Sequence, residues 1–356
     1  MLVYSQEELK IKLEKMVNTY NKTINLWKKG YNYSHKKLNI NTYPSVSNIE
    51  LTNACGMKCI MCPRGHMKRK IGYISLELFE KIIKQMKYNT RIVLHHFGDP
   101  LLHPQIGKII EICHKYGIQA SFSTNPSSLT KEKIKQILDS KLDYLHISLD
   151  GATKETYEKI RRGRADYGVA IQNIEKFLKE KNFRKNRKNH NLPITTIAII
   201  RMKETKNEIE DFKKQWKNKK GIDFVEIKDF ITWDGSIKEI TSLADEFSHK
   251  YKREYYYPCF WPWGKVTVLW DGRVVPCCFD YDAKLVLGDL NKQTLKEIWN
   301  SKKMQEFRKQ NIENSFPKGH LCINCKEREG FPPSKAYPLN LLLRRRLNFI
   351  NYFKYN

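Results

Sequence analysis

The chain has 356 residues, 40% hydrophobic and 12% aromatic, which is the composition of a folded protein with one large domain and a smaller one. No run approaches the roughly 20 consecutive apolar residues of a membrane span, and the polar N-terminus does not resemble a signal peptide, so we expect a cytoplasmic protein. The net charge of +27 is compatible with an anionic partner. Few basic clusters contain aromatic residues, however, so we expect most lysines to lie on solvated faces.

Residues 1–45 are predicted to form a helix followed by a linker. Ser5 and Glu8 have the spacing of a capping box, and the helical pattern ends near Gly30. Apolar residues recur on one face of this helix: Leu9, Leu13, Met16, Val17, Tyr20, Ile24 and Trp27.

Residues 46–235 alternate between short β-rich runs and helical patterns. Helices are predicted to start after Ser75 and Thr130 and to end at Gly117 and Gly221. Six strands are predicted, within residues 47–53, 91–97, 118–124, 143–149, 194–200 and 223–230. This alternation indicates an α/β fold, a partial (β/α)6 TIM-like barrel with its active site at the carboxyl ends of the strands.

Residues 236–335 have a different pattern and are predicted to form a small cysteine-rich α+β domain. A hairpin over residues 264–279 turns at Asp271 and Gly272, and residues 294–310 are helical. Little apolar sequence remains for an independent core, so we expect a metal group to help hold this region together. Residues 336–356 form a basic, aromatic tail that is compatible with an anionic membrane surface or with packing on the body.

The cysteines suggest metal binding, because a cytosolic chain of this size has no need of disulfides. Cys113 stands alone at an apolar helical position and is expected to be buried. The first group, Cys55, Cys59 and Cys62, follows the first predicted strand. A structural zinc site requires four ligands, whereas three thiolates with an open fourth position suit a cubane iron-sulfur cluster.

The C-x3-C-x2-C spacing after a first strand resembles the signature of the radical S-adenosylmethionine (SAM) superfamily, although a zinc knuckle has similar spacing. The resemblance implies that the open iron of the cluster binds the amino and carboxylate groups of SAM. An electron from the cluster then cleaves SAM, and a 5'-deoxyadenosyl radical removes a hydrogen atom from the substrate. The position after Cys59 is usually aromatic in this family; here Ile60 offers the adenine apolar contact without stacking.

The segment HFGDPLLHP, residues 96–104, resembles the G-G-E-P segment of the family, which receives the SAM amino group. The resemblance assigns this contact to Gly98, Asp99 and Pro100, with Phe97 in place of the first glycine. Asp99 is one methylene shorter than the usual glutamate, so we expect backbone contact from Gly98 more than side-chain contact from Asp99.

Two later segments also resemble the family. STNPSS implies that Ser123, Thr124 and Asn125 line the cofactor pocket, although these residue types are also common in ordinary turns. ISLDGATKETYEKIRRG implies that Ser148 and Asp150 lie near the SAM ribose. It also implies that Arg161 pairs with the SAM carboxylate, which its planar fork suits.

The second cysteine group comprises Cys259, Cys277, Cys322 and Cys325. On chemistry alone these thiols suit a zinc ribbon. Together with DGRVVPCC, LGDL and LKEIWNS, they resemble the twitch module, a short SPASM domain, which implies an auxiliary [4Fe-4S] cluster. Their intervals are similar to those of the radical SAM dehydrogenases of aminocyclitol biosynthesis. Cys278 points away from Cys277 by strand alternation, as either a bystander or an alternative ligand.

The resemblance implies a radical SAM oxidoreductase that acts on a sugar, nucleotide-sugar or cyclitol in glycan or natural-product biosynthesis. The expected reaction is oxidation of a secondary alcohol to a ketone, with the auxiliary cluster as electron acceptor or as a structural element only. Epimerisation would follow if the radical were quenched. A basic pocket would favour an anionic substrate, and a flavodoxin or ferredoxin would supply electrons. Radical modification of a ribosomal peptide and RNA binding with structural metal sites are the alternatives.

The general base is not marked by any motif. Candidates at the ends of later strands are Arg201, Lys228 and Asp229. His95 and His96 lie within a predicted strand, where one of them is expected in the core.

Overall fold

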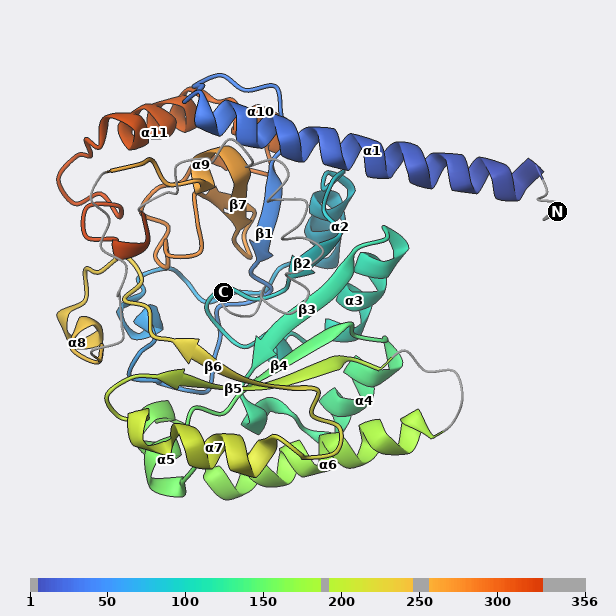
Figure 1. Cartoon of the computed structure of the whole chain (residues 1–356), viewed down its shortest axis with the longest axis vertical. Helices are drawn as coiled ribbons and strands as arrows, with labels where there is room; N and C mark the ends of the chain where they lie inside the picture. The colour runs from blue at the N-terminus through green and yellow to red at the C-terminus, as the bar shows by residue number, and fades with distance from the viewer. Residues whose placement is uncertain (1–5, 187–191, 246–255, 329–356) are drawn as a thin grey trace.

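The structure, a computed structural model, describes residues 6–186, 192–245 and 256–328 (Figure 1). The basic tail at residues 336–356 lies outside the described residues. Among the helices of the described part, none is long and apolar enough to cross a membrane.

The fold is built on one sheet of nine strands in the order β6-β5-β4-β3-β2-β1-β7-β8-β9. Strands β1 to β6 are parallel neighbours, as the predicted barrel requires, and β7 joins β1 in parallel before β8 and β9 continue the sheet antiparallel. The six barrel strands are β1 (Ser45–Ile49), β2 (Arg91–Val93), β3 (Gln119–Thr124), β4 (Tyr144–Ser148), β5 (Ile194–Arg201) and β6 (Phe224–Asp229). The remaining strands are β7 (Lys265–Val268), β8 (Arg273–Val275) and β9 (Gly288–Asp289). The prediction of a partial α/β barrel is therefore confirmed.

Helices follow the barrel strands and cover the outer face of the sheet (Figure 1). They are α2 (Leu76–Lys84), α3 (Ile106–Lys115), α4 (Lys131–Asp139), α5 (Lys154–Arg161), α6 (Tyr167–Lys185) and α7 (Ile209–Trp216). Strand residues such as Phe122, Ile147 and Ile197 point outward into the core that these helices complete. Because alternate strand residues point to opposite faces, the intervening positions line the lumen, meaning the inner face of the barrel.

The predicted helix boundaries have the expected local chemistry. The Ser75 side chain accepts a hydrogen bond from Leu78 N, and Thr130 accepts one from Lys133 N, so both residues are N-caps. Gly117 directly follows the end of α3 with a φ of +66°, a region that favours glycine. The helix expected to end at Gly221 ends earlier, at Trp216, and Gly221 lies in the turn that follows with a φ of +97°.

The N-terminal helix α1 (Gln6–Ser34) continues past the expected end at Gly30. Its last turns are docked on the body, where Lys29 Nζ donates to Gly264 O over 2.8 Å and Tyr33 OH donates to Pro258 O over 2.6 Å. These buried contacts stabilise the last turn of the helix, beyond Gly30.

The first turns of α1 project away from the body (Figure 1). Met16 and Tyr20 are 69% and 66% exposed, and Trp27 is half exposed. At Met16, Tyr20 and Trp27 the apolar face expected from the sequence is therefore exposed.

The small C-terminal region is continuous with the barrel. Val46 of β1 pairs with Val266 of β7, and Trp263 and Leu295 belong to the same hydrophobic core as the barrel residues. The helical stretch expected at residues 294–310 is two helices, because the Ser301 side chain caps a new one by accepting from Met304 N. The helices here are α8 (Lys238–Thr241), α9 (Trp261–Gly264), α10 (Leu295–Trp299) and α11 (Lys302–Glu313).

The short 3-10 helices lie mostly in loops that follow strands. They are η1 (Pro63–His66), η2 (Pro100–Leu102), η3 (Pro126–Ser128), η4 (Lys206–Glu208) and η5 (Lys326–Arg328). Three of them begin with a proline, whose fixed φ suits a first helical position.

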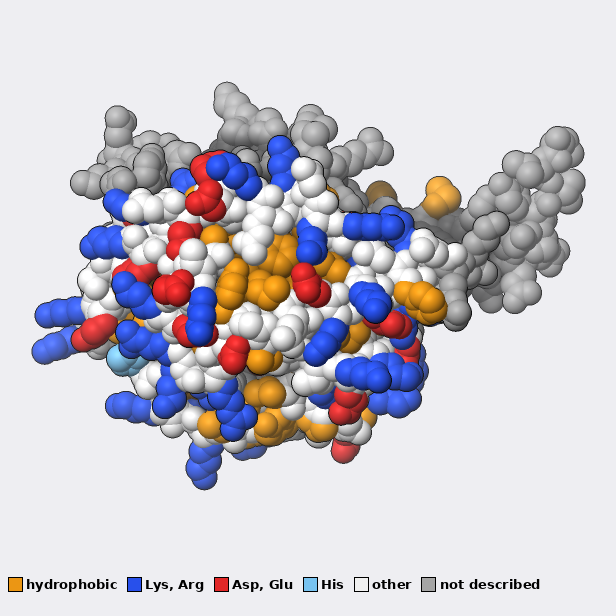
Figure 2. Space-filling view, turned by 90° about the horizontal axis from the view of Figure 1, so that it is seen from below, with side chains coloured by type: hydrophobic (Ala, Val, Ile, Leu, Met, Phe, Trp, Pro, Cys, Tyr) orange, Lys and Arg blue, Asp and Glu red, His pale blue; other side chains and the backbone are white. Residues whose placement is uncertain are grey.

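Lysine and arginine side chains are spread over the face shown in Figure 2, among acidic and uncharged ones. On this face the positive charge is distributed as expected for solvated lysines.

Candidate active site

The first cysteine group lies at the mouth of the barrel, meaning the carboxyl ends of β1 to β6. Cys55, Cys59 and Cys62 follow β1, are partly buried, and lie close enough to interact electrostatically, and none forms a disulfide. Burial raises the pKa of the Cys55 thiol to about 11 and that of Cys62 to about 12. Thiols in such a site ionise when a cationic ligand offsets the cost of burying their charge.

A second, smaller hydrophobic core surrounds this loop. Its buried members come from the cysteine loop, from the loops after β2 and β5, from α5, from the segment after β6 and from the loop after β8: Met61, Phe97, Ile160, Met202, Phe230, Ile237, Ile240 and Tyr281. Ile60, Cys59 and Cys62 pack against it. Trp233 covers the loop and donates from Nε1 to Met61 O over 2.8 Å. Cys59 and Cys62 therefore lie beside apolar side chains while remaining partly exposed.

The end of α5 holds the cysteine loop in place. Lys58 N donates to Arg161 O over 3.0 Å, and Ile60 N donates to Ile160 O over 2.9 Å. Gly163 approaches the same loop so closely that a Cβ there would lie 2.7 Å from Gly56 O. The segment ISLDGATKETYEKIRRG is thus hydrogen-bonded directly to the loop that carries the first cysteine group.

Arg161 lies beside the cysteines but is already paired. Its Nη2 is 2.6 Å from Asp150 Oδ2, and its Nη1 is 3.5 Å from Cys59 Sγ. The other Asp150 oxygen accepts from Ile200 N over 2.8 Å. Asp150 therefore uses both carboxylate oxygens to join three segments, a positioning role that the sequence did not suggest.

Gly98 brings the loop after β2 against the cysteine loop. Its φ is +122°, and a Cβ at this position would lie 2.3 Å from Thr52 O. The next residue, Asp99, donates from its backbone N to Ala54 O over 2.8 Å. Only glycine permits this approach.

The Asp99 carboxylate is occupied by neighbouring donors. It accepts from Thr124 Oγ1 over 2.7 Å, from Ser128 Oγ over 2.8 Å, from Leu101 N over 3.0 Å and from the Asn125 side chain. Burial raises its pKa, and these hydrogen bonds oppose the shift. Asp99 thus orders the segment of Ser123, Thr124 and Asn125, and its backbone is occupied as well, because its carbonyl accepts from Leu102 N over 3.0 Å.

Asn125 Oδ1 and Arg161 Nε are among the buried polar atoms that lack a partner within the described residues. One is a hydrogen-bond acceptor and the other is a cationic donor. A ligand that carries both an ammonium and a carboxylate group would complement this pair of atoms.

The structure also brings the four cysteines of the second group close to one another. Cys322 lies within electrostatic range of Cys259 and Cys325, and Cys277 lies within range of Cys322 and Cys325. Burial raises the pKa of Cys277 and of Cys322. Four soft thiols, two of them buried and two partly buried, suit an iron-sulfur cluster. Across residues 6–186, 192–245 and 256–328, no three His, Cys, Asp or Glu side chains are arranged around a single metal ion.

A buried polar network connects the second cysteine group to the mouth. His96 Nε2 donates to Cys278 O over 2.8 Å, and its Nδ1 is 3.5 Å from Glu50 Oε1. Glu50 also forms a bidentate ion pair with Arg69 at 2.7 and 2.8 Å, and Arg69 Nε donates to Tyr281 O. The Arg69 and His96 interactions offset the burial of Glu50 and lower its pKa to about 2.

The three candidate bases do not lie together. Arg201 and Asp229 are register partners at the ends of β5 and β6, and by alternation they lie on the helix-covered side of the sheet. Lys228 lies on the lumen side, 3.8 Å from Glu226 Oε2. The sequence reasoning overlooked Glu226 and His146, whose alternation with outward-facing apolar residues was the available signal.

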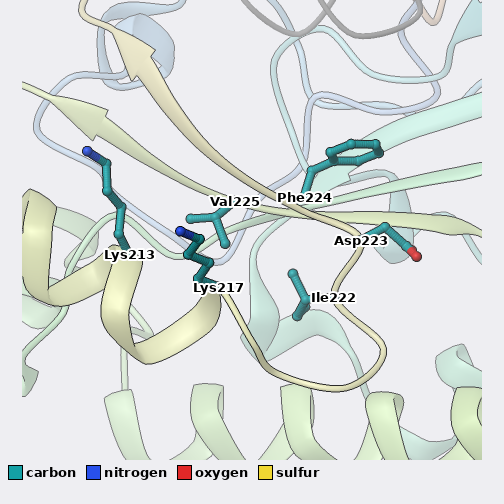
Figure 3. A pocket seen from close by; sticks show the side chains of 6 residues that line it. All are labelled: Lys213, Lys217, Ile222, Asp223, Phe224 and Val225. Carbon is teal, nitrogen blue, oxygen red and sulfur yellow. The ribbon is translucent and has the colours of Figure 1, made fainter.

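A surface pocket lies away from the mouth (Figure 3). It is lined by residues at the end of α7, in the loop that follows and at the start of β6: Lys213, Lys217, Ile222, Asp223, Phe224 and Val225. Because it lies at the opposite end of β6 from the mouth, we do not include it in the candidate site.

Comparison with known proteins identifies both cysteine regions. The model for the radical SAM superfamily matches residues 49–215, and the model for an iron-sulfur cluster-binding domain, SPASM, matches residues 259–326. The chain belongs to the radical SAM superfamily. SAM and [4Fe-4S] clusters are its cofactors, and the predicted family and SPASM region are confirmed. The RNA-binding alternative is not needed to explain the cysteines of a radical SAM protein.

Two relatives match most of the chain. One is the tungsten-containing aldehyde ferredoxin oxidoreductase cofactor-modifying protein of Pyrococcus furiosus, 24% identical over 79% of this chain and 87% of the relative. The other is the S-adenosyl-L-methionine-dependent 2-deoxy-scyllo-inosamine dehydrogenase of Niallia circulans, 21% identical over 79% of this chain and 92% of the relative. Among solved structures, native anSMEcpe with bound AdoMet shares the fold, with a TM-score of 0.55 and 18% identity, over 87% of this chain and 100% of that one.

Proposed function

We propose that this radical SAM enzyme oxidises a secondary alcohol of a cyclitol or sugar to a ketone. The similarity to a cyclitol dehydrogenase over most of both chains supports this substrate class. The lumen also supports it, because Ser148, His146, Thr196 and Glu226 occupy inward positions there and offer hydrogen bonds to a polyhydroxylated ligand.

In this proposal Cys55, Cys59 and Cys62 hold the SAM-binding cluster. SAM lies against Ile60, the backbone of residues 98–100 and the 123–125 segment. The two partnerless atoms described above receive its amino acid group: Asn125 Oδ1 accepts from the ammonium, and Arg161 Nε donates to the carboxylate. When bound, the cluster and SAM supply an organic radical that removes a hydrogen atom from the substrate carbon.

Cys259, Cys277, Cys322 and Cys325 hold the second cluster, which would accept the electron released when the ketone forms. The observation that carries this part is the buried network from Cys278 through His96 to Glu50, because it brings the second cysteine group into contact with the loop after β2. Cys278 takes part in this network through its backbone carbonyl, and its thiol lies within electrostatic range of Cys277.

The charge of the substrate, the electron donor and the alternative reactions are also proposals. Lys228 lies in the lumen, so an anionic group on the substrate has a cationic side chain available. A flavodoxin or ferredoxin would reduce the SAM-binding cluster. Epimerisation would use the same site with hydrogen return in place of electron transfer, and modification of a peptide would require the mouth to admit a longer chain.

The test is anaerobic incubation of the reconstituted protein with SAM, a reductant and substrates deuterated at their carbinol carbons: 2-deoxy-scyllo-inosamine, myo-inositol and a nucleotide-sugar. We expect deuterium in 5'-deoxyadenosine together with a ketone product. Solvent hydrogen in a recovered epimer would indicate epimerisation. Absence of deuterium transfer from every alcohol would reject the proposed substrate class.

A further inference from the structure

The lumen contains a cluster of titratable side chains to which the proposed function assigns substrate binding but no proton transfer. Glu226 of β6 lies with its Oε2 atom 3.7 Å from His146 Nδ1 of β4 and 3.8 Å from Lys228 Nζ. Glu226 and His146 are each only 8% exposed. Three ionisable groups from two strands thus meet inside the barrel.

The strand register places this cluster beneath the mouth. His146 pairs with Thr196, and Ala198 pairs with Glu226, so the inward positions of β4, β5 and β6 are adjacent. His146 lies two residues before Ser148, which corresponds to about 7 Å along the strand. Arg161 bonds to Ser148 O and lies beside Cys59. Glu226 and His146 therefore form part of the floor below the candidate cofactor site.

The Glu226 carboxylate is left without hydrogen bonds. Within the described residues, neither of its oxygens has a hydrogen-bond partner, although both are buried. Burial of a carboxylate without donors is costly, and such a group calls for an explanation in terms of function or a bound ligand. A substrate hydroxyl above this floor would supply the missing donor.

The surrounding groups favour a proton acceptor here. Burial raises the pKa of Glu226 to about 7, against the opposing effect of Lys228. The charged or titratable groups that face it are His146 from β4 and Lys228 from β6. His95 after β2 lies within electrostatic range of His146 and Lys228, and Arg91 of β2 lies within range of His146. Burial, with Lys228 and His96, lowers the pKa of His95 to about 3. Since Ser123 N donates to its Nδ1, the neutral ring carries its proton on Nε2.

We propose that Glu226 is the catalytic base that receives the hydroxyl proton of the substrate alcohol; this rests on the proposed function. After the hydrogen atom has left the carbinol carbon, the O–H bond breaks and its proton passes to the Glu226 carboxylate. One electron passes to an oxidised [4Fe-4S] cluster, and the carbon–oxygen bond becomes a double bond. The products are a ketone, a protonated Glu226 and a reduced cluster.

The decisive experiment separates hydrogen abstraction from proton removal. Glu226→Gln is isosteric and is compared with Glu210→Gln, the same change at an exposed position on α7. With carbinol-deuterated 2-deoxy-scyllo-inosamine, Glu226→Gln is expected to transfer deuterium to 5'-deoxyadenosine while forming at least about 100-fold less ketone per deoxyadenosine. The control should match wild type. An unchanged ketone ratio in Glu226→Gln overturns the proposal, whereas no deuterium transfer in wild type points instead to failure of the proposed function.

A second measurement requires no turnover. Infrared difference spectra of the cluster-loaded wild type, referenced to Glu226→Gln, should show a protonated carboxyl band that disappears with a midpoint near pH 7. Glu226→Asp, which keeps the carboxyl, should retain a titrating band and recover part of the ketone yield. Absence of any band assignable to Glu226, or titration in the range of an exposed carboxyl, contradicts the proposal even if the probe is not a substrate.

Discussion

At the scale of single residues, Gly98 shows why the site tolerates so little change. Its φ of +122° lies in a region that residues with a Cβ rarely adopt, and an added Cβ would lie 2.3 Å from Thr52 O and 2.7 Å from Asn53 Cα. Both contacts are with backbone, so no side-chain rotation can relieve them. The loop after β2 is therefore fitted to the cysteine loop by backbone approach alone.

Gly98→Ala should lower the free energy of unfolding by about 3 kcal/mol or more, because backbone strain and overlap add. It should also loosen the cysteine loop and reduce the iron retained after desalting. Gly117→Ala is the control, because Gly117 also has a positive φ but no atom within 4 Å of the added Cβ. That change should cost only about 1 kcal/mol. Equal losses in urea unfolding of the two variants would contradict the close approach at Gly98.

The Glu50–Arg69 pair is the second residue-scale case. Both side chains are almost fully buried. Arg69→Met would leave the Glu50 charge without its main partner and should cost about 3–5 kcal/mol in urea unfolding at pH 7. The double variant with Glu50→Gln removes the charge as well and should be more stable than the single variant. If the double variant is the less stable of the two, the pair is not coupled as described.

The Glu50–Arg69 pair also determines how the free energy of unfolding changes with pH. The Glu50 pKa of about 2 lies below the ordinary value of 4.5, so the native state favours the ionised form. Its contribution to stability is complete above about pH 4.5 and is lost as the pH falls toward 2.

At the scale of elements, the buried Arg308 of α11 fastens three segments. Its guanidinium donates to Pro262 O of α9 over 2.9 Å, and to Leu38 O of the N-terminal linker and Trp299 O of α10, each over 2.8 Å. It also lies 4.8 Å from the centre of the Trp299 ring. Burial lowers its pKa to about 9. Arg308 thus joins the small region to the linker, together with the bonds between Asn300 and Ile40 and the bond from Trp263 Nε1 to Lys37 O.

Arg308→Ala should reduce the free energy of unfolding by about 3–5 kcal/mol, since three buried carbonyl groups lose their donor. The exposed neighbour Lys309 provides the matched control, and Lys309→Ala should change stability by less than about 0.5 kcal/mol. Urea unfolding followed by tryptophan fluorescence measures both. A loss below 1 kcal/mol for Arg308→Ala would mean that water replaces the guanidinium.

Elements were predictable from the sequence where their signals are local. Ser75 and Thr130 cap their helices by accepting hydrogen bonds from backbone N atoms three residues later. Such a local pattern can be recognised in the sequence alone. The pairing of β1 with β7 was not predictable, because it joins Val46 to Val266 across the whole barrel. The role of Asp99 was missed for a similar reason, since its donors come from a different strand end.

In the candidate site too, residues marked by a local sequence pattern were predictable and residues brought together by the fold were not. The cysteine spacings pointed to the cofactors, because ligand geometry constrains sequence spacing within a loop. Glu226 and His146 escaped attention because each is a single polar residue in an apolar strand, and only the register of β4, β5 and β6 brings them together. Arg201 and Asp229 were nominated by position at strand ends, which does not specify the face of the sheet.

At the scale of the whole molecule, the barrel and the SPASM region share one sheet and one hydrophobic core. Trp263, Val268 and Cys322 belong to the same core as the barrel strands. Elements that share a core usually unfold together. We therefore expect the proposed auxiliary cluster to stabilise the barrel as well as the region that holds it.

The double variant Cys322→Ala with Cys325→Ala should accordingly retain about four of an expected eight irons and unfold at lower urea in one transition. Because the first cysteine group is intact, it should still bind SAM. Cys113→Ala provides the same chemical change at a buried cysteine of α3 outside both groups, and it should keep its full iron content. Two separate unfolding transitions in the double variant would show that the SPASM region is energetically independent of the barrel, despite the continuous sheet. Retention of all the iron would remove Cys322 and Cys325 from the ligand set.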